Sequence, residues 1–335
     1  MKMALGLALN GLGRTSPNPC VGALLVKGGR VVGHGFHLKS GKDHAEFIAI
    51  KNAGQKARGA VLYVTLEPCC HYGKTPPCTD AIIKAGIKKV VISVSKDPNP
   101  SVCGKGVKIL RKAGIDVVCG ICEDEGRFLI QPYLKSRVSN LPYVVLKTAC
   151  TFDFKITDKN GKSKWITSKE SRMFSRNLRS HSDAILTGGG TVLADDPMLS
   201  AKNRPLRVIL DSGLRTPLSA KVLRDKNVLF VTTDSANVGK FKKFEIFNAG
   251  KKINIKKVLL ELARRGIRSV FVEAGNALNT SFVKAGVVDK FYIFVAPKIF
   301  NGGLDAFSTP VPKFKLVQTR KISDDILFEG YANLY

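Results

Sequence analysis

The feature that most constrains this chain is a set of zinc-ligand residues in three separate segments. His44 is followed two residues later by Glu46, and Pro68-Cys69 and then Cys78 come further along the chain. One imidazole and two thiolates can hold a zinc ion and leave a fourth position for water. The fold must therefore bring three segments to one point, with Glu46 beside the metal and not bound to it.

Glu46 indicates which reaction a zinc ion in this site would catalyse. A histidine with a glutamate two residues on, then a Pro-Cys pair and another cysteine, is typical of zinc-dependent nucleobase deaminases, in which the glutamate moves protons between water and the ring. The sequence therefore predicts hydrolytic deamination, with His44, Cys69 and Cys78 as ligands and Glu46 as the proton shuttle.

The spacing of the two cysteines departs from that pattern. Eight residues separate Cys69 from Cys78, where two are typical. Cys70 and His71 lie in this gap and are adjacent donors that could replace Cys69 or His44. A histidine among buried thiols with no metal is the plain structural alternative.

The remaining cysteines indicate a reducing compartment. Eight cysteines in a chain of 335 residues do not resemble the disulfide framework of a small secreted domain, so we expect a cytoplasmic protein. Cys119 and Cys122 form a C-x-x-C that could be a redox pair or half of a zinc knuckle. No second such pair completes a four-ligand site, so the favoured interpretation is two buried small side chains.

The formal net charge of +28 raises the question of a nucleic-acid partner. The basic residues are spread along the whole chain without a basic arm or tail, and small phosphorylated ligands explain them at least as well. We therefore expect no nucleic-acid partner. No apolar run approaches the ~20 residues of a membrane span, so we expect no membrane association, and Met1 to Leu9 is interpreted as a helix and not as a signal peptide.

The first part of the chain alternates strand and helix signals. Strands are predicted at 20–27, 30–36, 60–65, 90–94 and 116–118, and helices at 1–9, 44–52, 106–113 and 123–138, with a further helix that starts after Pro76-Pro77 and includes Cys78. Gly28-Gly29 is a favourable two-residue hairpin turn. The pattern predicts an α/β sandwich of parallel strands and crossover helices, with His44 and Cys78 at helix N-termini.

The segment 139–142 is interpreted as a linker, because the pattern restarts after it. Strands are predicted at 143–148, 184–187, 207–210, 228–232, 269–273, 291–296 and 326–334, and helices at 169–179 and 255–265. Glycine clusters follow two of these strands, at 188–190 and at Gly275, and neither matches the Rossmann fingerprint. An ordinary tight turn is the favoured interpretation, and close approach of backbone amides to a phosphate is the alternative.

Several motifs together resemble those of the bifunctional riboflavin-biosynthesis deaminase/reductase. In the first half they are 17–22 (PNPCVG), 44–46 (HAE), 67–69 (EPC), 73–78 (GKTPPC) and 97–100 (DPNP), and in the second half 164–167 (KWIT), 191–197 (TVLADDP) and 272–275 (VEAG). The resemblance covers nearly the whole chain, and the long gap between Cys69 and Cys78 is this family's own spacing.

The resemblance implies two domains and two consecutive reactions. Residues 1–141 would form a cytidine-deaminase-like α/β/α sandwich that uses Zn²⁺ to deaminate a diaminopyrimidinone carrying a ribosylamino 5-phosphate. Residues 142–335 would form a dihydrofolate-reductase-like α/β domain that reduces the ribosyl group with NADPH. The partner would be a phosphorylated pyrimidine substrate, and we expect a homo-oligomer.

The resemblance also implies which residues contact the ligands. Substrate contacts in the deaminase are expected at Asn18, His37, Lys74, Asp97 and Asn99, and in the reductase at Ser163, Arg179, Leu199, Lys202 and Glu273. NADPH contacts are expected at Ala149, Trp165, Thr167, Thr191, Asp195, Gly275, Asn276, Ala277 and Leu278. The residue types alone leave alternatives: Trp165 in the core, Asp97 and Asn99 as turn formers, and Arg179 and Glu273 as surface charges without a ligand.

Three residues depart from the family pattern. Cys70 stands where serine is usual, Phe154 where a glycine is usual, and Lys202 where an arginine is usual. The first bears on the metal ligands, and the other two bear on the efficiency of the reductase. Two other functions stay open at this point: a nucleic-acid deaminase with an appended binding domain, and a deaminase whose second domain serves only assembly.

Overall fold

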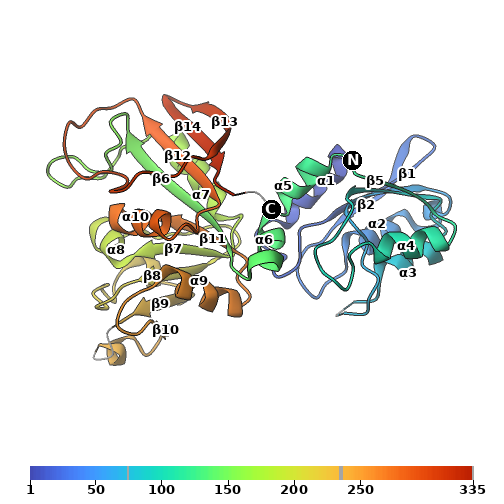
Figure 1. Cartoon of the computed structure of the whole chain (residues 1–335), viewed down its shortest axis with the longest axis horizontal. Helices are drawn as coiled ribbons and strands as arrows, with labels where there is room; N and C mark the ends of the chain where they lie inside the picture. The colour runs from blue at the N-terminus through green and yellow to red at the C-terminus, as the bar shows by residue number, and fades with distance from the viewer. Residues whose placement is uncertain (74, 234–236, 334–335) are drawn as a thin grey trace. The chain divides into compact units, whose positions relative to one another are not determined.

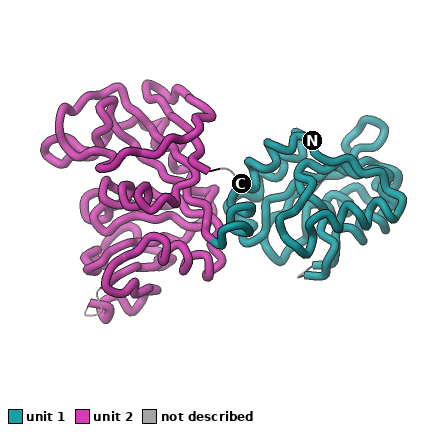
Figure 2. The backbone as a smooth tube through the Cα atoms, in the orientation of Figure 1, with its two compact units in different colours: residues 1–140, 335 teal, residues 141–334 magenta. Residues whose placement is uncertain are grey.

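The computed structural model describes residues 1–73, 75–233 and 237–333. The chain forms two compact units, residues 1–140 and residues 141–334, which Figure 2 colours teal and magenta. The division falls inside the segment 139–142 that the sequence marks as a linker. Within the described ranges, no helix has the length and apolar character needed to cross a membrane.

The first unit is a sheet between two layers of helices (Figure 1). The strands are β1 (Gly22–Lys27), β2 (Arg30–Phe36), β3 (Val61–Leu66), β4 (Lys89–Val94) and β5 (Asp116–Cys119), in the order β2-β1-β3-β4-β5. The helices are α1 (Lys2–Ala8), α2 (Ala45–Ala53), α3 (Cys78–Lys84), α4 (Lys105–Lys112), α5 (Glu123–Leu129) and α6 (Gln131–Ser139). Helices α2, α3 and α4 lie on one face of the sheet, and α1 and α5 lie on the other.

The expectation of a parallel sheet is correct only for β3, β4 and β5. Strand β1 pairs antiparallel with both β2 and β3. The reason is the two-residue turn at Gly28 and Gly29, whose φ angles are 55° and 72°, because a loop this short can join only antiparallel strands.

Helix α2 packs closely on the sheet, and this packing fixes the position of His44, the N-cap residue of the helix. A Cβ atom on Gly33 of β2 would lie 2.3 Å from the carbonyl oxygen of Ala49, and one on Gly35 would lie 2.6 Å from that of Ala45. Glycine is therefore required at both positions for the helix to approach. Ala45, Ala49 and Ala53 are buried in the core of this unit.

The single helix expected over 123–138 is divided into α5 and α6. Ile130 stands between them with φ −104°, outside helical geometry, and a proline occupies the first turn of α6. Proline has no backbone N–H to donate to the preceding turn, which explains the break. Helix α6 therefore runs in its own direction and can bring Tyr133 to the site described below.

The second unit is built on a nine-stranded sheet, in the order β10-β9-β8-β7-β11-β6-β12-β14-β13. Its strands are β6 (Tyr143–Thr151), β7 (Ala184–Gly188), β8 (Leu206–Leu210), β9 (Val228–Thr232), β10 (Glu245–Asn248), β11 (Ser269–Glu273), β12 (Lys290–Ala296), β13 (Lys315–Ile322) and β14 (Asp325–Tyr331). Its helices are α7 (Lys169–Arg179), α8 (Gly189–Asp195), α9 (Ile255–Arg264) and α10 (Asn276–Lys284). The strands from β10 to β12 are parallel, and β14 and β13 are antiparallel to their neighbours.

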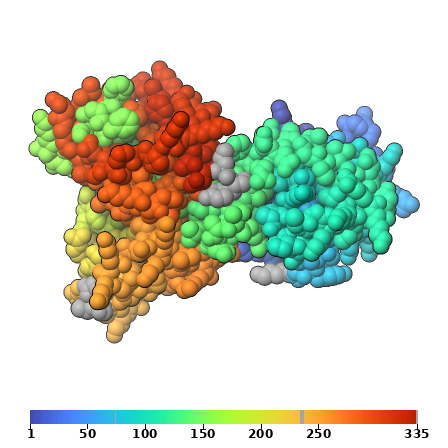
Figure 3. Space-filling model, in the orientation of Figure 1, coloured from blue at the N-terminus to red at the C-terminus, as the bar shows by residue number. Residues whose placement is uncertain are grey.

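The core of the second unit lies on both faces of this sheet. Helices α9 and α10 share one hydrophobic cluster with the sheet, which includes Leu259 and Phe282. Helix α7 contributes Leu178 to a separate cluster with Phe271 and Phe294. In Figure 3 the light green segment near residue 155 lies among the orange and red segments, and Ile156 donates its backbone N–H to the carbonyl of Leu304 at 2.8 Å.

Four elements of the second unit differ from the sequence-based expectation. Strands β10 and β13 and helices α8 and α10 were not predicted. The tight-turn interpretation of both glycine clusters is wrong, because the cluster at 188–190 leads into α8 and Gly275 is the N-cap of α10. The last strand ends at Tyr331, and the expected end at Leu334 lies outside the described residues.

Candidate active sites

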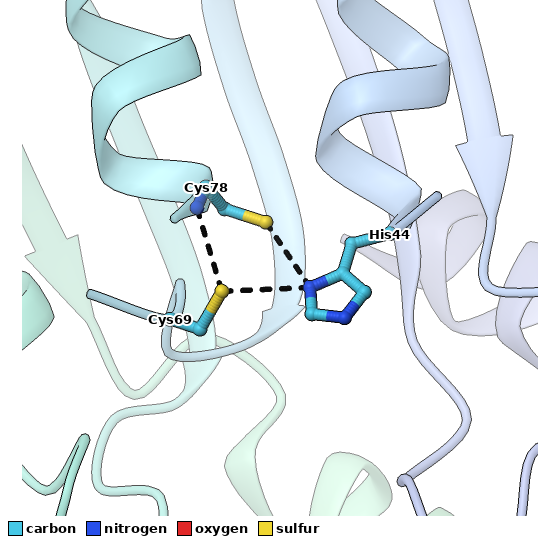
Figure 4. A group of neighbouring side chains, drawn as sticks. All are labelled: His44, Cys69 and Cys78. Carbon is cyan, nitrogen blue, oxygen red and sulfur yellow. Dashed lines mark hydrogen bonds between the residues drawn. The ribbon is translucent and has the colours of Figure 1, made fainter. Parts of the chain in front are cut away.

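The predicted zinc ligands meet at one point in the first unit (Figure 4). His44 is the N-cap of α2, Cys78 is the first residue of α3, and Cys69 lies in the loop after β3. The Nδ1 atom of His44 lies 3.3 Å from Sγ of Cys78 and 3.4 Å from Sγ of Cys69, and the candidate ligand atoms all lie within 4.8 Å of one another.

This cluster fits a zinc ion by its chemistry and size, with two sulfur donors and one nitrogen donor around a common centre. The pKa of the Cys69 thiol is lowered to about 4, because hydrogen bonds with Cys78 and His44 stabilise its thiolate. Cys70 and His71, the alternative donors, lie outside the metal-sized cluster found among the described residues. The Cys70 thiol instead donates to the carbonyl of Ser101 at 3.5 Å.

Glu46 lies in the first turn of α2 and is buried, with 3% of its surface exposed. Burial and the nearby charge of Cys69 raise the pKa of its carboxyl group to about 7. A carboxyl with this pKa can take up and release a proton near neutral pH, as general acid–base catalysis requires.

A cavity of about 260 Å³ opens beside the cluster. Its lining includes His44, Glu46 and Cys69 and the predicted substrate contacts Asn18, His37, Asp97 and Asn99. The predicted contact Lys74 lies outside the described residues.

His37 is held as a neutral ring in this lining. Its Nδ1 atom donates to the carbonyl of Asp43 at 3.0 Å, so Nε2 can accept from the amide of Asn18 at 3.1 Å. Burial lowers the pKa of His37, which favours the uncharged ring. The wall that His37 and Asn18 form is therefore polar and uncharged.

The lining also contains residues that sequence reasoning missed. Tyr133 and Arg137 of α6 line the cavity, and the Tyr133 hydroxyl donates to Oδ1 of Asp97 at 2.6 Å. Their spacing of four residues, which places two side chains on one helix face, was the available signal. Asp97 also accepts the backbone N–H of Asn99 at 2.8 Å, as a turn-forming residue does. Asp97 therefore stabilises a turn and also lines the cavity.

A second cavity, of about 970 Å³, lies in the second unit at the carboxyl ends of parallel strands. Most of the ligand contacts predicted from the sequence for this unit line the cavity: Ala149, Ser163, Trp165, Thr167, Arg179, Thr191, Asp195, Leu199, Glu273, Gly275, Asn276, Ala277 and Leu278. Lys202 is exposed and is not part of this lining. The carboxyl ends of parallel strands are the usual position of a ligand site in such sheets.

The two helices that begin after β7 and β11 present their N-termini to this cavity. Neither α8 nor α10 has a side-chain cap, so their first N–H groups need other partners. A Cβ atom on Gly189 would lie 2.6 Å from the carboxyl carbon of Asp211, which explains the glycine there. Amides at a helix N-terminus without a side-chain cap fit the diphosphate of a dinucleotide such as NADPH.

Arg179 and Glu273 form a partly buried ion pair in the cavity wall. Nε of Arg179 lies 2.6 Å from Oε1 of Glu273 and Nη2 lies 2.9 Å from Oε2, so the pair is joined by two parallel hydrogen bonds. The interpretation of these residues as surface charges is therefore wrong. Lys147 of β6 also lines the cavity, and burial lowers its pKa. A single lysine inside an apolar strand was the signal that sequence reasoning missed.

Trp165 lies at the cavity and not in the core, because 62% of its surface is exposed. The guanidinium of Arg172 lies 4.2 Å from the centre of its ring. Close by, the Ser163 hydroxyl donates to the Asp195 carboxylate at 2.6 Å, which joins a predicted substrate contact to a predicted cofactor contact.

Comparison with known proteins assigns the family. Residues 1–94 match the family model of the cytidine and deoxycytidylate deaminase zinc-binding region, and residues 142–328 match the RibD C-terminal domain. The riboflavin biosynthesis protein RibD of Aquifex aeolicus is 46% identical over 313 residues, which cover 91% of this chain and 88% of that protein. The chain belongs to the RibD family.

Other members show the same extent of similarity. RibD of Escherichia coli is 37% identical over 97% of this chain and 96% of its own length. The crystal structure of the deaminase/reductase from Thermotoga maritima is 40% identical, with a TM-score of 0.90 over 99% of this chain and 97% of that chain. The resemblance stated from the motifs is therefore confirmed, and so is the fold class of a deaminase-like unit followed by a reductase domain.

The family has two activities of riboflavin biosynthesis, a zinc-dependent deaminase and an NADPH-dependent reductase. A nucleic-acid deaminase with an appended binding domain is not supported, because the second half matches a RibD domain. A second half that serves only assembly is not supported for the same reason.

Proposed function

We propose that residues 1–141 deaminate a diamino-hydroxy-phosphoribosylaminopyrimidine and that residues 142–335 then reduce the product, 5-amino-6-(5-phosphoribosylamino)uracil, to its ribityl form. The relative from Thermotoga maritima is named for both activities. The observation that carries the proposal is that the two units hold separate cavities with different donors: His44, Cys69 and Glu46 in one, and helix N-termini with the Arg179 and Glu273 pair in the other.

In the deaminase, His44, Cys69 and Cys78 would hold a zinc ion, and the bound ion would lower the pKa of a water molecule. Glu46 accepts the first proton of the attacking water and delivers it to the ring nitrogen, and it then carries the second proton, from the new hydroxyl group on the ring carbon, to the departing amine. The balance is one water consumed and one ammonia released. Asn18 and His37 orient the polar edge of the ring from the uncharged wall.

In the reductase, NADPH supplies the hydride when it is bound. The amides at the start of α8 and α10, together with Thr191 and Asp195, hold the cofactor in the cavity. Arg179, Glu273 and Ser163 contact the substrate, and the 5-phosphate would reach Lys202 outside the cavity lining. These contacts place the ribosyl group beside the cofactor and fix its orientation.

We also place the chain in the cytoplasm. All eight of its cysteines are free, and Cys103 is exposed. Free thiols, and thiolate metal ligands above all, persist where the compartment keeps cysteines reduced.

Metal analysis of single variants tests the deaminase site. We expect about one zinc per chain in the native protein, loss of zinc in Cys69→Ser and Cys78→Ser, and retention in the matched control Cys70→Ser. Loss of zinc in Cys70→Ser with retention in Cys69→Ser would contradict the assignment.

The fluorescence of the chain's only tryptophan tests the cofactor site. Because Trp165 lies exposed in the second cavity, NADPH should quench its emission in a saturable titration. The same titration of Glu46→Gln should give an unchanged dissociation constant, because Glu46 belongs to the other cavity. Emission that does not respond to NADPH would contradict the placement of the cofactor.

A further inference from the structure

Glu67 is a buried carboxylate whose hydrogen bonds go to the backbone of a different segment. It is 3% exposed and lies just after β3. Its Oε2 atom accepts the backbone N–H of Asp97 at 3.2 Å and that of Gly104 at 2.9 Å, and its Oε1 atom accepts that of Val107 at 3.2 Å. One side chain therefore fixes three points of the segment 97–107.

The partners of Glu67 include the start of α4. Gly104 is the N-cap of this helix, has φ 72°, and provides no side-chain cap. The Glu67 carboxylate supplies the missing acceptor and places a negative charge at the helix N-terminus, where it is favourable. Gly106 allows the approach, because a Cβ atom there would lie 2.2 Å from the carbonyl oxygen of Pro68.

This arrangement joins two parts of the deaminase site. Glu67 lies two residues before the zinc-ligand candidate Cys69 and is itself a lining residue of the cavity, but both of its carboxylate oxygens accept backbone N–H groups. The segment that it holds carries Asp97 and Asn99 in the same lining. Asn99 donates its N–H to Asp97, so the backbone position of Asp97 also sets that of Asn99. The distance between the metal loop and these two side chains therefore depends on Glu67.

We propose that Glu67 is a positioning residue of the deaminase, which holds Asp97 and Asn99 in register with the metal loop. This inference rests on the proposed function, in which Asp97 and Asn99 contact the substrate. Glu67 acts through them, so its loss should weaken substrate binding and leave the metal ligands in place.

Glu67→Gln is the sharpest single change, because it keeps the size of the side chain and replaces one acceptor oxygen by an NH₂ donor. That donor would face backbone N–H groups, which cannot accept a hydrogen bond. We expect the deaminase KM of the full chain to rise by about tenfold or more, with zinc content and reductase kinetics unchanged. Glu125→Gln, an exposed change on α5, is the matched control and should leave KM unaltered.

Hydrogen exchange gives a readout that does not depend on activity. The amides of Asp97, Gly104 and Val107 should exchange faster in Glu67→Gln than in the native chain. Glu67→Asp retains an acceptor-only carboxylate, and its KM should lie closer to the native value than that of Glu67→Gln. Equal KM values for the two variants, or native exchange rates in Glu67→Gln, would overturn the proposal.

A variant cycle separates positioning from general destabilisation. If Glu67 acts through Asp97 and Asn99, then adding Glu67→Gln to a chain that carries both Asp97→Ala and Asn99→Ala should raise KM by less than about twofold beyond that chain alone. Fully multiplicative effects would refute the proposed route. A raised KM in Asn99→Ala with a native KM in Glu67→Gln refutes the positioning role alone. A native KM in Asn99→Ala refutes the substrate role of Asn99 and the inference built on it.

Discussion

Removal of Arg179 should destabilise the second unit strongly. The guanidinium and the Glu273 carboxylate are 17% and 13% exposed, so Arg179→Met would leave a carboxylate largely shielded from water without its bidentate partner. Breaking a buried pair in this way costs about 3–5 kcal/mol in the free energy of unfolding. Lys147 lies close enough to keep a compensating charge, so we expect about 3 kcal/mol, the lower end of that range.

The loss should depend on pH. Burial alone would raise the pKa of Glu273, but the charges of Arg179 and Lys147 outweigh burial and hold the pKa below its usual value. In the native chain this group stabilises the fold above its unfolded pKa, and that contribution is lost as pH falls through the lowered folded pKa. In Arg179→Met burial raises the folded pKa instead, so the difference in stability should be largest near pH 7.5 and smaller at pH 5.

Urea unfolding followed by Trp165 fluorescence measures this effect, because the chain's only tryptophan reports on the second unit. Arg265→Met removes the partner of Glu261 and Glu245 at the surface and is the control, with an expected loss within about 1 kcal/mol. Adding Glu273→Met to Arg179→Met should restore most of the stability. A loss under about 1 kcal/mol in Arg179→Met, or no recovery in the double variant, would refute the reasoning.

Three further changes have expected outcomes. Phe154 has φ 58° and an exposed side chain, so Phe154→Gly should stabilise the second unit by up to about 1 kcal/mol in urea unfolding, and a loss would show that the ring packs usefully. Lys202→Ala should raise the reductase KM about ten- to a hundredfold without affecting deamination, and an unchanged KM would place the phosphate at another cation. Replacing Cys119 and Cys122 by alanine should leave zinc content and both activities intact, whereas loss of zinc would reveal a second metal site.

The sequence predicted best the elements whose signals are local. The hairpin at Gly28-Gly29, helix α7 and strands β9 and β11 match their expected bounds, because apolar periodicity and turn residues determine them within a few residues. Strand β13 could not be found in this way. It lies at the edge of the sheet with almost every residue exposed, so its side chains show no apolar alternation.

In the candidate sites, too, the sequence predicted the features that depend on residue type and missed those that depend on the order of the strands. The ligand triad could be predicted from residue types, because zinc chemistry restricts the donors. The pairing of Arg179 with Glu273 could not, since the two residues are 94 positions apart and only the order of strands brings them together. The glycine clusters were interpreted as turns because glycine favours both turns and helix N-termini, and only the packing of α8 and α10 distinguishes the two.

The central claim, two reactions at two separate sites, is tested most directly by Glu46→Gln supplied in turn with each pyrimidine. With the diamino compound, ammonia release should fall about a hundredfold or more, and NADPH oxidation should fall with it, because the second site receives no product. With the deaminated compound, NADPH oxidation should proceed at the native rate, and zinc should remain bound. Native ammonia release from the variant, or loss of NADPH oxidation with the deaminated compound, would contradict the account.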